Sequence, residues 1–144
     1  MKLNKKRSLP ASRQGFTLVE LLVVIAVIGL LSGMVVISIT QAKAKSRDAR
    51  RVADINTIVT ALNLYHNDYN AYPIYDGYIE DQTNTLAIEL VGAGTISGLP
   101  IDPLNSGNYR YYYQSTAGRD FYMEYYLETT SMSGKPQGKN YVIP

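Results

Sequence analysis

The feature that most constrains this chain is an unbroken apolar run near its N-terminus. Residues 16–39 read FTLVELLVVIAVIGLLSGMVVISI and contain one ionisable side chain, Glu20, and no proline. As an α-helix this run would be about 36 Å long, enough to cross a hydrocarbon core of about 30 Å. A chain of 144 residues cannot surround so long an apolar helix with its own residues. We therefore expect residues 16–39 to span a membrane.

The residues before this run form a basic leader. Residues 1–15 contain five Lys or Arg and no acid, whereas the chain from Phe16 onward has nine basic and twelve acidic residues, a net charge of −3. The overall charge of +2 therefore reflects the leader and does not indicate nucleic-acid binding. Under the positive-inside rule the leader stays cytoplasmic, although a second basic segment, residues 43–51, reduces this asymmetry.

Two other interpretations of the apolar run compete with a processed membrane helix. One is an ordinary secretory signal peptide cleaved after Ala44, and the other is a membrane anchor that is never processed. Glu20 argues against both, because a carboxylate within a membrane helix is costly and usually marks a functional position. A cation that met it would offset this cost. Cleavage after Gly15 would create such a cation, the α-amino group of Phe16.

A motif surrounds this point, with the sequence RQGFTLVELL at residues 13–22. It resembles the class III signal of type IV prepilins and type II secretion pseudopilins. The resemblance implies that a membrane-bound prepilin peptidase removes residues 1–15, cutting between Gly15 and Phe16, and then N-methylates Phe16. It also implies that Glu20 pairs with the terminal amine of a neighbouring subunit during assembly.

Two glycines lie within the apolar run at helical spacing. Gly29 and Gly33 are four residues apart, so they share one face of the expected helix. Small residues at this spacing let helix backbones approach closely in lipid, where burial of apolar surface no longer drives association. The alternative is that the two glycines only weaken the helix locally, because glycine costs about 1 kcal/mol in a helix relative to alanine. We expect Gly29 and Gly33 to be helix-packing positions.

The helical pattern continues beyond residue 39. Apolar side chains recur at steps of three and four, Asn and Thr line another face, and residues 34–70 contain no Gly or Pro. The apolar stripe consists of Val52, Ile55, Val59, Leu62, His66 and Tyr69, with Ile58 and Tyr65 beside it. We expect one helix from Phe16 to about Tyr69, about 81 Å long, with residues 40–70 as an amphipathic stem. So small a protein cannot cover such a helix alone, which predicts burial within a filament.

The stem and the C-terminal part carry opposite charge. Residues 43–51 contain five basic residues and one acid, whereas residues 71–144 contain eight acids and four bases. One interpretation is a solvated basic face with weak helix pairs, Arg50 with Asp54 and Asp48 with Arg51. The other is that the basic stem of one subunit faces the acidic part of another. A DNA-binding patch is the third and least favoured interpretation.

Residues 71–98 are expected to form a connector. Asn70-Ala71-Tyr72-Pro73 ends the stem, because proline disfavours helix in the residue before it. Within the connector, Asn84 to Val91 could form a short helix, with Thr83 or Asn84 as its N-cap.

Residues 99–144 are expected to form a small antiparallel sheet. Strand-like runs occur at 109–115 and 121–129, joined by a turn that contains glycine, and a last short strand is expected at 141–143. Alternation along the second run predicts one face packed on the stem and one in solvent. The layout resembles the pilin fold, an α+β fold in which a long N-terminal helix, its first half transmembrane, packs against a small C-terminal antiparallel sheet.

We expect no cofactor and no metal. The chain has no cysteine, which excludes disulfides, and its one histidine, His66, lies at the edge of the apolar stripe, where a packing role is expected. The entry to the hairpin resembles that of the major pseudopilins, which often hold calcium in the loop after the hairpin. Here residues 129–140 contain no carboxylate, and calcium sites usually need charged oxygen ligands.

These features predict a structural subunit of a type IV pilus-like filament and not an enzyme. The resemblance implies a single-pass subunit of the bacterial inner membrane with a cytoplasmic N-terminus. An assembly ATPase and a membrane platform protein then add it to a periplasmic or extracellular helical filament of identical copies. The alternative is a type II secretion pseudopilin. A DNA-uptake pilin is less favoured, because residues 71–144 are acidic, whereas a C-terminal part that binds nucleic acid would be basic.

Overall fold

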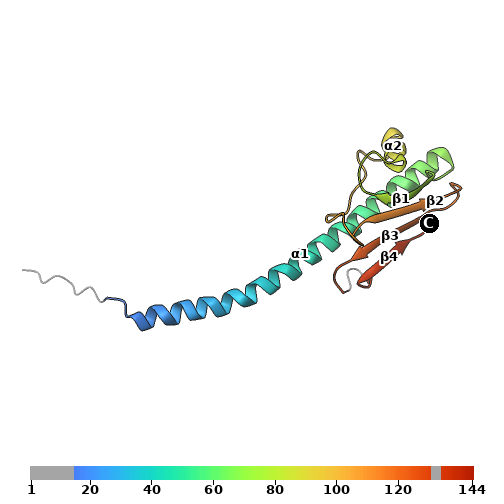
Figure 1. Cartoon of the computed structure of the whole chain (residues 1–144). Helices are drawn as coiled ribbons and strands as arrows, with labels where there is room; N and C mark the ends of the chain where they lie inside the picture. Colours follow the sequence, from blue (N-terminus) through green and yellow to red (C-terminus); the bar gives the residue numbers. More distant parts are fainter. Residues whose placement is uncertain (1–14, 131–133) are drawn as a thin grey trace, which may run out of the picture. The chain divides into compact units, whose positions relative to one another are not determined.

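The computed structural model describes residues 15–130 and 134–144 (Figure 1). Its elements follow in the order α1 (Leu18–Tyr69), β1 (Tyr75–Ile79), α2 (Thr85–Gly92), β2 (Tyr111–Ser115), β3 (Tyr122–Leu127) and β4 (Gly138–Val142). The chain divides into two compact units, residues 1–38 and 39–144, and α1 contributes to both. These elements confirm the predicted α+β fold, a long N-terminal helix with a small antiparallel sheet.

The sheet of the second unit has four antiparallel strands in the order β1-β2-β3-β4. The predicted central hairpin is present as β2 and β3, and β4 begins at Gly138, three residues before the predicted start. Strand β1 was not predicted, because its residues fall in the range expected to be a connector. The sheet therefore begins at Tyr75 and not after residue 99.

Strand β1 has a sequence that gives little sign of a strand. Its central residues, Asp76 and Gly77, are depleted in strands, so local preference does not favour an extended backbone there. Backbone pairing with β2 holds it instead, with Tyr75 opposite Ser115 and Ile79 opposite Tyr111. As an edge strand it depends on this one neighbour, which sequence periodicity could not reveal.

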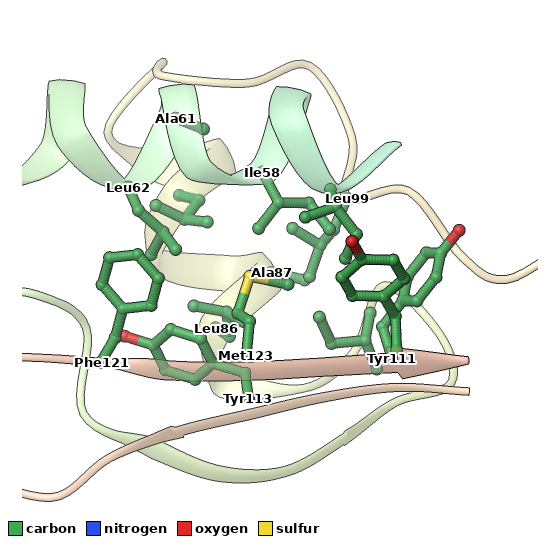
Figure 2. Packing of buried hydrophobic residues seen from close by; sticks show 14 of the residues in the cluster. Ile58, Ala61, Leu62, Leu86, Ala87, Leu99, Tyr111, Tyr113, Phe121 and Met123 are labelled. Atoms are coloured by element: carbon green, nitrogen blue, oxygen red, sulfur yellow. The ribbon is translucent and has the colours of Figure 1, made fainter. Parts of the chain in front are cut away.

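The core of the second unit lies between α1, α2 and one face of the sheet. Figure 2 shows Ile58 and Leu62 of α1 above Met123, with Leu86 and Ala87 entering from α2. The inward face of β3 is fully buried, as the alternation of the sequence predicted. The buried members of α1 are Ile55, Ile58, Ala61 and Leu62, so the apolar stripe is centred close to its predicted position. Its predicted last member, Tyr69, is exposed and stacks on Tyr65.

The end of α1 is joined to the hairpin. Asn70 adopts a left-handed conformation with a φ of 54°, and the chain then turns into Tyr72 and Pro73, as predicted. The N–H of Tyr72 donates to the carbonyl of Gly118 in the β2–β3 turn at 2.8 Å. Gly118 has a φ of 69°, and a Cβ there would lie 3.1 Å from the Tyr72 carbonyl oxygen. Glycine therefore satisfies both the turn and the close contact.

The short helix α2 begins as predicted. Asn84 is its N-cap, and the Asn84 side-chain oxygen accepts a hydrogen bond from the N–H of Ala87 at 2.9 Å. Leu86, Ala87 and Leu90 of α2 are buried. Helix α2 thus covers the core beside α1.

Candidate processing and assembly site

The first unit is a helix without a protein environment. Among residues 15–38, every side chain whose exposure the structure describes is exposed, including Phe16, which is 78% exposed. Within the described part of the chain, α1 is the one helix that is long and apolar enough to cross a membrane by length and composition. Exposed apolar surface of this extent is unfavourable in water, so the helix requires lipid or other helices around it.

A capping box closes the N-terminal end of α1. The N–H and the hydroxyl of Thr17 both donate to Oε2 of Glu20, each at 2.8 Å. In return, the N–H of Glu20 donates to the Thr17 hydroxyl oxygen at 3.2 Å. Thr17 is therefore the N-cap of a helix that begins at Leu18, and Glu20 is its reciprocal partner. Two backbone donors at the helix end are satisfied within the chain.

Sequence reasoning singled out Glu20 but assigned no role to Thr17. The available signal was the pattern Thr-x-x-Glu immediately before an apolar helical run, which is the signature of a capping box. The cap holds the Glu20 carboxylate against the N–H of the residue after Phe16. A negative charge at this end also interacts favourably with the helix dipole. The geometry places an anion next to the position where cleavage after Gly15 would create a cation.

The other predicted site residues lie on open surface. Gly15 precedes the helix, and a side chain at this position would meet nothing within 4 Å. The same holds for Gly29 and Gly33 within α1. These two glycines therefore serve no packing need within the described chain. Their predicted use in helix–helix contact stays a prediction.

A second cluster, which sequence reasoning did not predict, lies in the second unit. The Arg51 side chain is 0% exposed, although arginine is almost never fully buried without partners. Its guanidinium donates to Asp48 at 2.8 Å, to Glu128 at 2.6 Å, and to both oxygens of Asp102 at 2.6 and 3.1 Å. These acids come from α1, the residue directly after β3 and the segment before β2. We call Arg51, Asp48, Asp102 and Glu128 the Arg51 cluster.

The acids of the Arg51 cluster are themselves fully bonded. Burial disfavours the charged form of Asp48, but donors from the backbone of Glu128 and from Thr129 lower the pKa of Asp48 below its ordinary value. Arg47 forms a further ion pair with Glu128. This pairing, together with Arg51, lowers the pKa of Glu128 to about 2. Asp48 and Glu128 therefore stay charged at neutral pH, and Asp102 accepts from the Arg51 guanidinium through both of its oxygens.

This cluster corrects the interpretation of a solvated basic face and removes Arg47 and Arg51 from a basic surface for another subunit, whereas Lys43, Lys45 and Arg50 stay exposed. Asp48 and Arg51 do form a helix pair, but they are buried and not solvated. Arg47 and Arg51 face acids of the same chain, so they do not supply a basic surface for another subunit. The missed signal was the spacing 48, 51, 55, 58 and 62, which places Asp48 and Arg51 on the face that buries Ile55 and Ile58. The predicted pair of Arg50 with Asp54 is present on the surface at 3.7 Å.

The loop after the hairpin was expected to lack calcium, which stays a prediction, and residues 131–133 of this loop lie outside the described residues. Lys135 places its ammonium against the Tyr125 hydroxyl, a cation in the region where a metal would need anions. The Asn140 amide donates to the carbonyls of Pro136 and Gly138, and the Gln137 amide donates to the Glu128 carbonyl at 2.9 Å. Carbonyl oxygens that could face a metal are thus bonded to amides. Across residues 15–130 and 134–144, there is no group of three His, Cys, Asp or Glu that could hold a metal ion.

Comparison with known proteins decides the family. The family model of the prokaryotic N-terminal methylation motif matches residues 10–38, which include the capping box and both glycines. The chain is also 32% identical over 120 residues to the type II secretion system core protein G of Escherichia coli (strain K12), covering 75% of this chain and 83% of the relative. The chain belongs to the pilin and pseudopilin family.

Further relatives of this pseudopilin-family chain have the same name. Core protein G of Vibrio cholerae is 34% identical over 101 residues, which is 67% of this chain and 68% of the relative. That of Aeromonas hydrophila is 35% identical over 96 residues, covering 63% and 67%. No solved structure matches the chain. The N-terminal motif and the apolar helix α1 together indicate that this family member is anchored in a membrane.

Proposed function

We propose that this chain is a major subunit of a pseudopilus of the type II secretion class. A methylation motif, followed by an exposed apolar helix with a capped carboxylate at its start, is the observation that carries the proposal. The names of the relatives favour secretion over a surface pilus. The subunit waits in the inner membrane with its N-terminus in the cytoplasm. It contributes structure and no catalysis, and it uses no cofactor.

Processing and assembly use the same end of the chain. Prepilin peptidase cuts between Gly15 and Phe16 and methylates the new amine. The capping box then presents Glu20 beside that amine. When helices associate in lipid, the carboxylate of one subunit neutralises the amine of another, which removes the cost of keeping either charge unpaired. Gly29 and Gly33 allow close approach of these helices. A platform protein and an assembly ATPase supply the work of extraction.

Two substitutions separate the role of the Glu20 charge from the role of the capping box: Glu20→Gln and Thr17→Ala. Glu20→Gln keeps an acceptor for the cap but removes the negative charge, so we expect cleaved subunits that do not enter filaments. Thr17→Ala removes the two hydrogen bonds of the hydroxyl in the capping box and keeps the charge, so we expect reduced but measurable assembly. Immunoblots of cleaved protein and electron microscopy of sheared filaments provide the two readouts. Normal filament yield from Glu20→Gln would contradict the proposed role of the charge.

A further inference from the structure

The charges that remain exposed on the stem are separated along α1. Lys43, Lys45 and Arg50 are exposed, and none of them belongs to the Arg51 cluster; Lys43 and Arg50 lie on the same side of the helix, whereas Lys45 lies on another. Residues 55–67 contain no Lys, Arg, Asp or Glu, and the next charge is Asp68, which is exposed. One end of the stem is therefore basic on its surface and the other end acidic, with an uncharged stretch of about four turns between them.

Lys43, Arg50 and Asp68 share one flank of the helix. Lys43 and Arg50 are seven residues apart, which is about two turns, and Arg50 and Asp68 are eighteen residues apart, which is about five turns. Asp68 therefore lies in line with both cations, at a distance along the axis of about 27 Å from Arg50 and about 38 Å from Lys43. No pairing within one chain is possible over such distances.

The contacts that Arg50 and Asp68 make within their own chain are weak. Arg50 contacts Asp54 at 3.7 Å with an Arg50 side chain that is 66% exposed, so it is free to exchange partners. Asp68 accepts one long hydrogen bond from Asn67 at 3.4 Å. Among the described residues, Lys43 and Asp68 take part in no ion pair. Their charges are available to another molecule.

The exposed face beside this flank admits a close neighbour. It consists of short, uncharged side chains at alternating steps of four and three: Ala42, Ser46, Ala49, Ala53, Asn56, Thr60 and Asn63. Nothing on this face would clash with a second helix or repel it. The charges on the flank, and not this face, distinguish one axial position from another.

We propose that Lys43 and Arg50 of one copy of this chain pair with Asp68 of a second copy displaced by about 27–38 Å along the helix axis. This contact rests on the proposed filament and goes beyond it, because it fixes the axial register of two subunits. The basic end of one stem meets the acidic end of the other, and the same contact repeats along the filament. Without displacement, like charges face each other, and at intermediate offsets the charges face the uncharged residues 55–67, so the pairing favours the displaced register.

Cross-linking tests the register directly, because the chain contains no cysteine. In full-length protein carrying Ser46→Cys and Leu64→Cys, the exposed positions one turn before Arg50 and Asp68, both charges are kept, and the two thiols of one chain lie about 27 Å apart, too far for a short bis-maleimide. Any product is therefore between chains. We expect a ladder of multimers from intact filaments and none from the non-assembling Glu20→Gln background. The matched control carries Arg119→Cys and Lys139→Cys, two exposed positions off this flank, and should give no ladder.

Charge reversal supplies an independent readout. Lys43→Glu with Arg50→Glu should lower filament yield at least about tenfold, and adding Asp68→Lys should restore it. Arg119→Glu with Lys45→Glu reverses two exposed charges that lie off this flank and form no ion pair with any described residue, and should leave the yield near that of the wild type. Filaments of the double-cysteine protein that give no ladder, or charge reversals without effect on the yield, would overturn this inference alone. Absence of filaments from the wild type would overturn the proposed function and this inference with it.

Discussion

Between residues 18 and 38, α1 exposes every side chain that the structure describes, whereas between residues 48 and 62 it buries a continuous stripe. The first segment is apolar and has one charge, Glu20, held by Thr17 at the helix end. The second combines an apolar stripe with two buried charges, Asp48 and Arg51. Both segments are rich in apolar residues, so hydrophobicity alone does not predict which part of α1 is buried against its own chain. The two segments differ more clearly in where the partners of their charged groups lie.

The largest expected effect comes from the Arg51 cluster. Arg51→Met leaves Asp48, Asp102 and Glu128 without their shared cation, so we expect the second unit to lose about 3–5 kcal/mol of unfolding free energy. The matched control, Arg50→Met, removes an exposed cation one residue away and should cost at most about 0.5 kcal/mol. Denaturant unfolding of both proteins in detergent gives the comparison. Equal stability of the two variants would contradict the structural role of the cluster.

The next effect separates the two segments of α1 by packing. Ile58→Ala opens a cavity in the core and should cost about 2–5 kcal/mol. Ile28→Ala makes the same chemical change at an exposed position and should leave the unfolding of the second unit unchanged. The same denaturant measurement applies to both. A large effect of Ile28→Ala on the midpoint would show that the second unit depends on residues 18–38.

A smaller effect is expected from pH. The pKa of Glu128 lies at about 2 in the folded chain, below its ordinary value of 4.5, chiefly because Arg47 donates to its carboxylate. A lowered folded-state pKa contributes stability that is complete above about pH 4.5 and is lost as the pH falls towards 2. The midpoint of unfolding should fall across this window. Glu128→Gln should flatten the fall, and an identical slope in this variant would assign the acid sensitivity to other groups.

The smallest expected effect is that of removing calcium. Because amides and Lys135 occupy the loop after the hairpin, we expect the same melting temperature in excess calcium and in excess EDTA. A calcium ion that bound the folded state at a hundred times its Kd would add about 2.7 kcal/mol. Differential scanning fluorimetry would detect a shift of that size. A calcium-dependent rise in melting temperature would refute the expectation of a metal-free loop.

Regular elements with strong periodicity could be predicted from the sequence. The extent of α1, the cap of α2, the central hairpin and its alternating faces all follow from local patterns. Strand β1 could not be predicted, because Asp76 and Gly77 are extended only by pairing with β2. The direction of the buried stripe was readable in α1, but Arg51 was assigned to solvent because of its residue type. Its partners Asp102 and Glu128 lie 51 and 77 residues away, and no local pattern reveals them.

The candidate site divides in the same way. The motif around Gly15, Phe16 and Glu20 is readable because its residues are consecutive and its order is specific. The role of Thr17 was equally readable from the spacing of a capping box. How Glu20 is used between subunits depends on a second copy of the chain, so a single sequence supports it only as a hypothesis.

The identity of the mature N-terminus tests the central claim most directly. Mass spectrometry of the N-terminal peptide from membranes of the native host should show a chain that begins at N-methylated Phe16, with residues 1–15 absent. That result would place a positive terminus beside the capped carboxylate of Glu20. A chain that retains Met1, or one that begins after Ala44 and lacks the apolar helix altogether, would contradict the account.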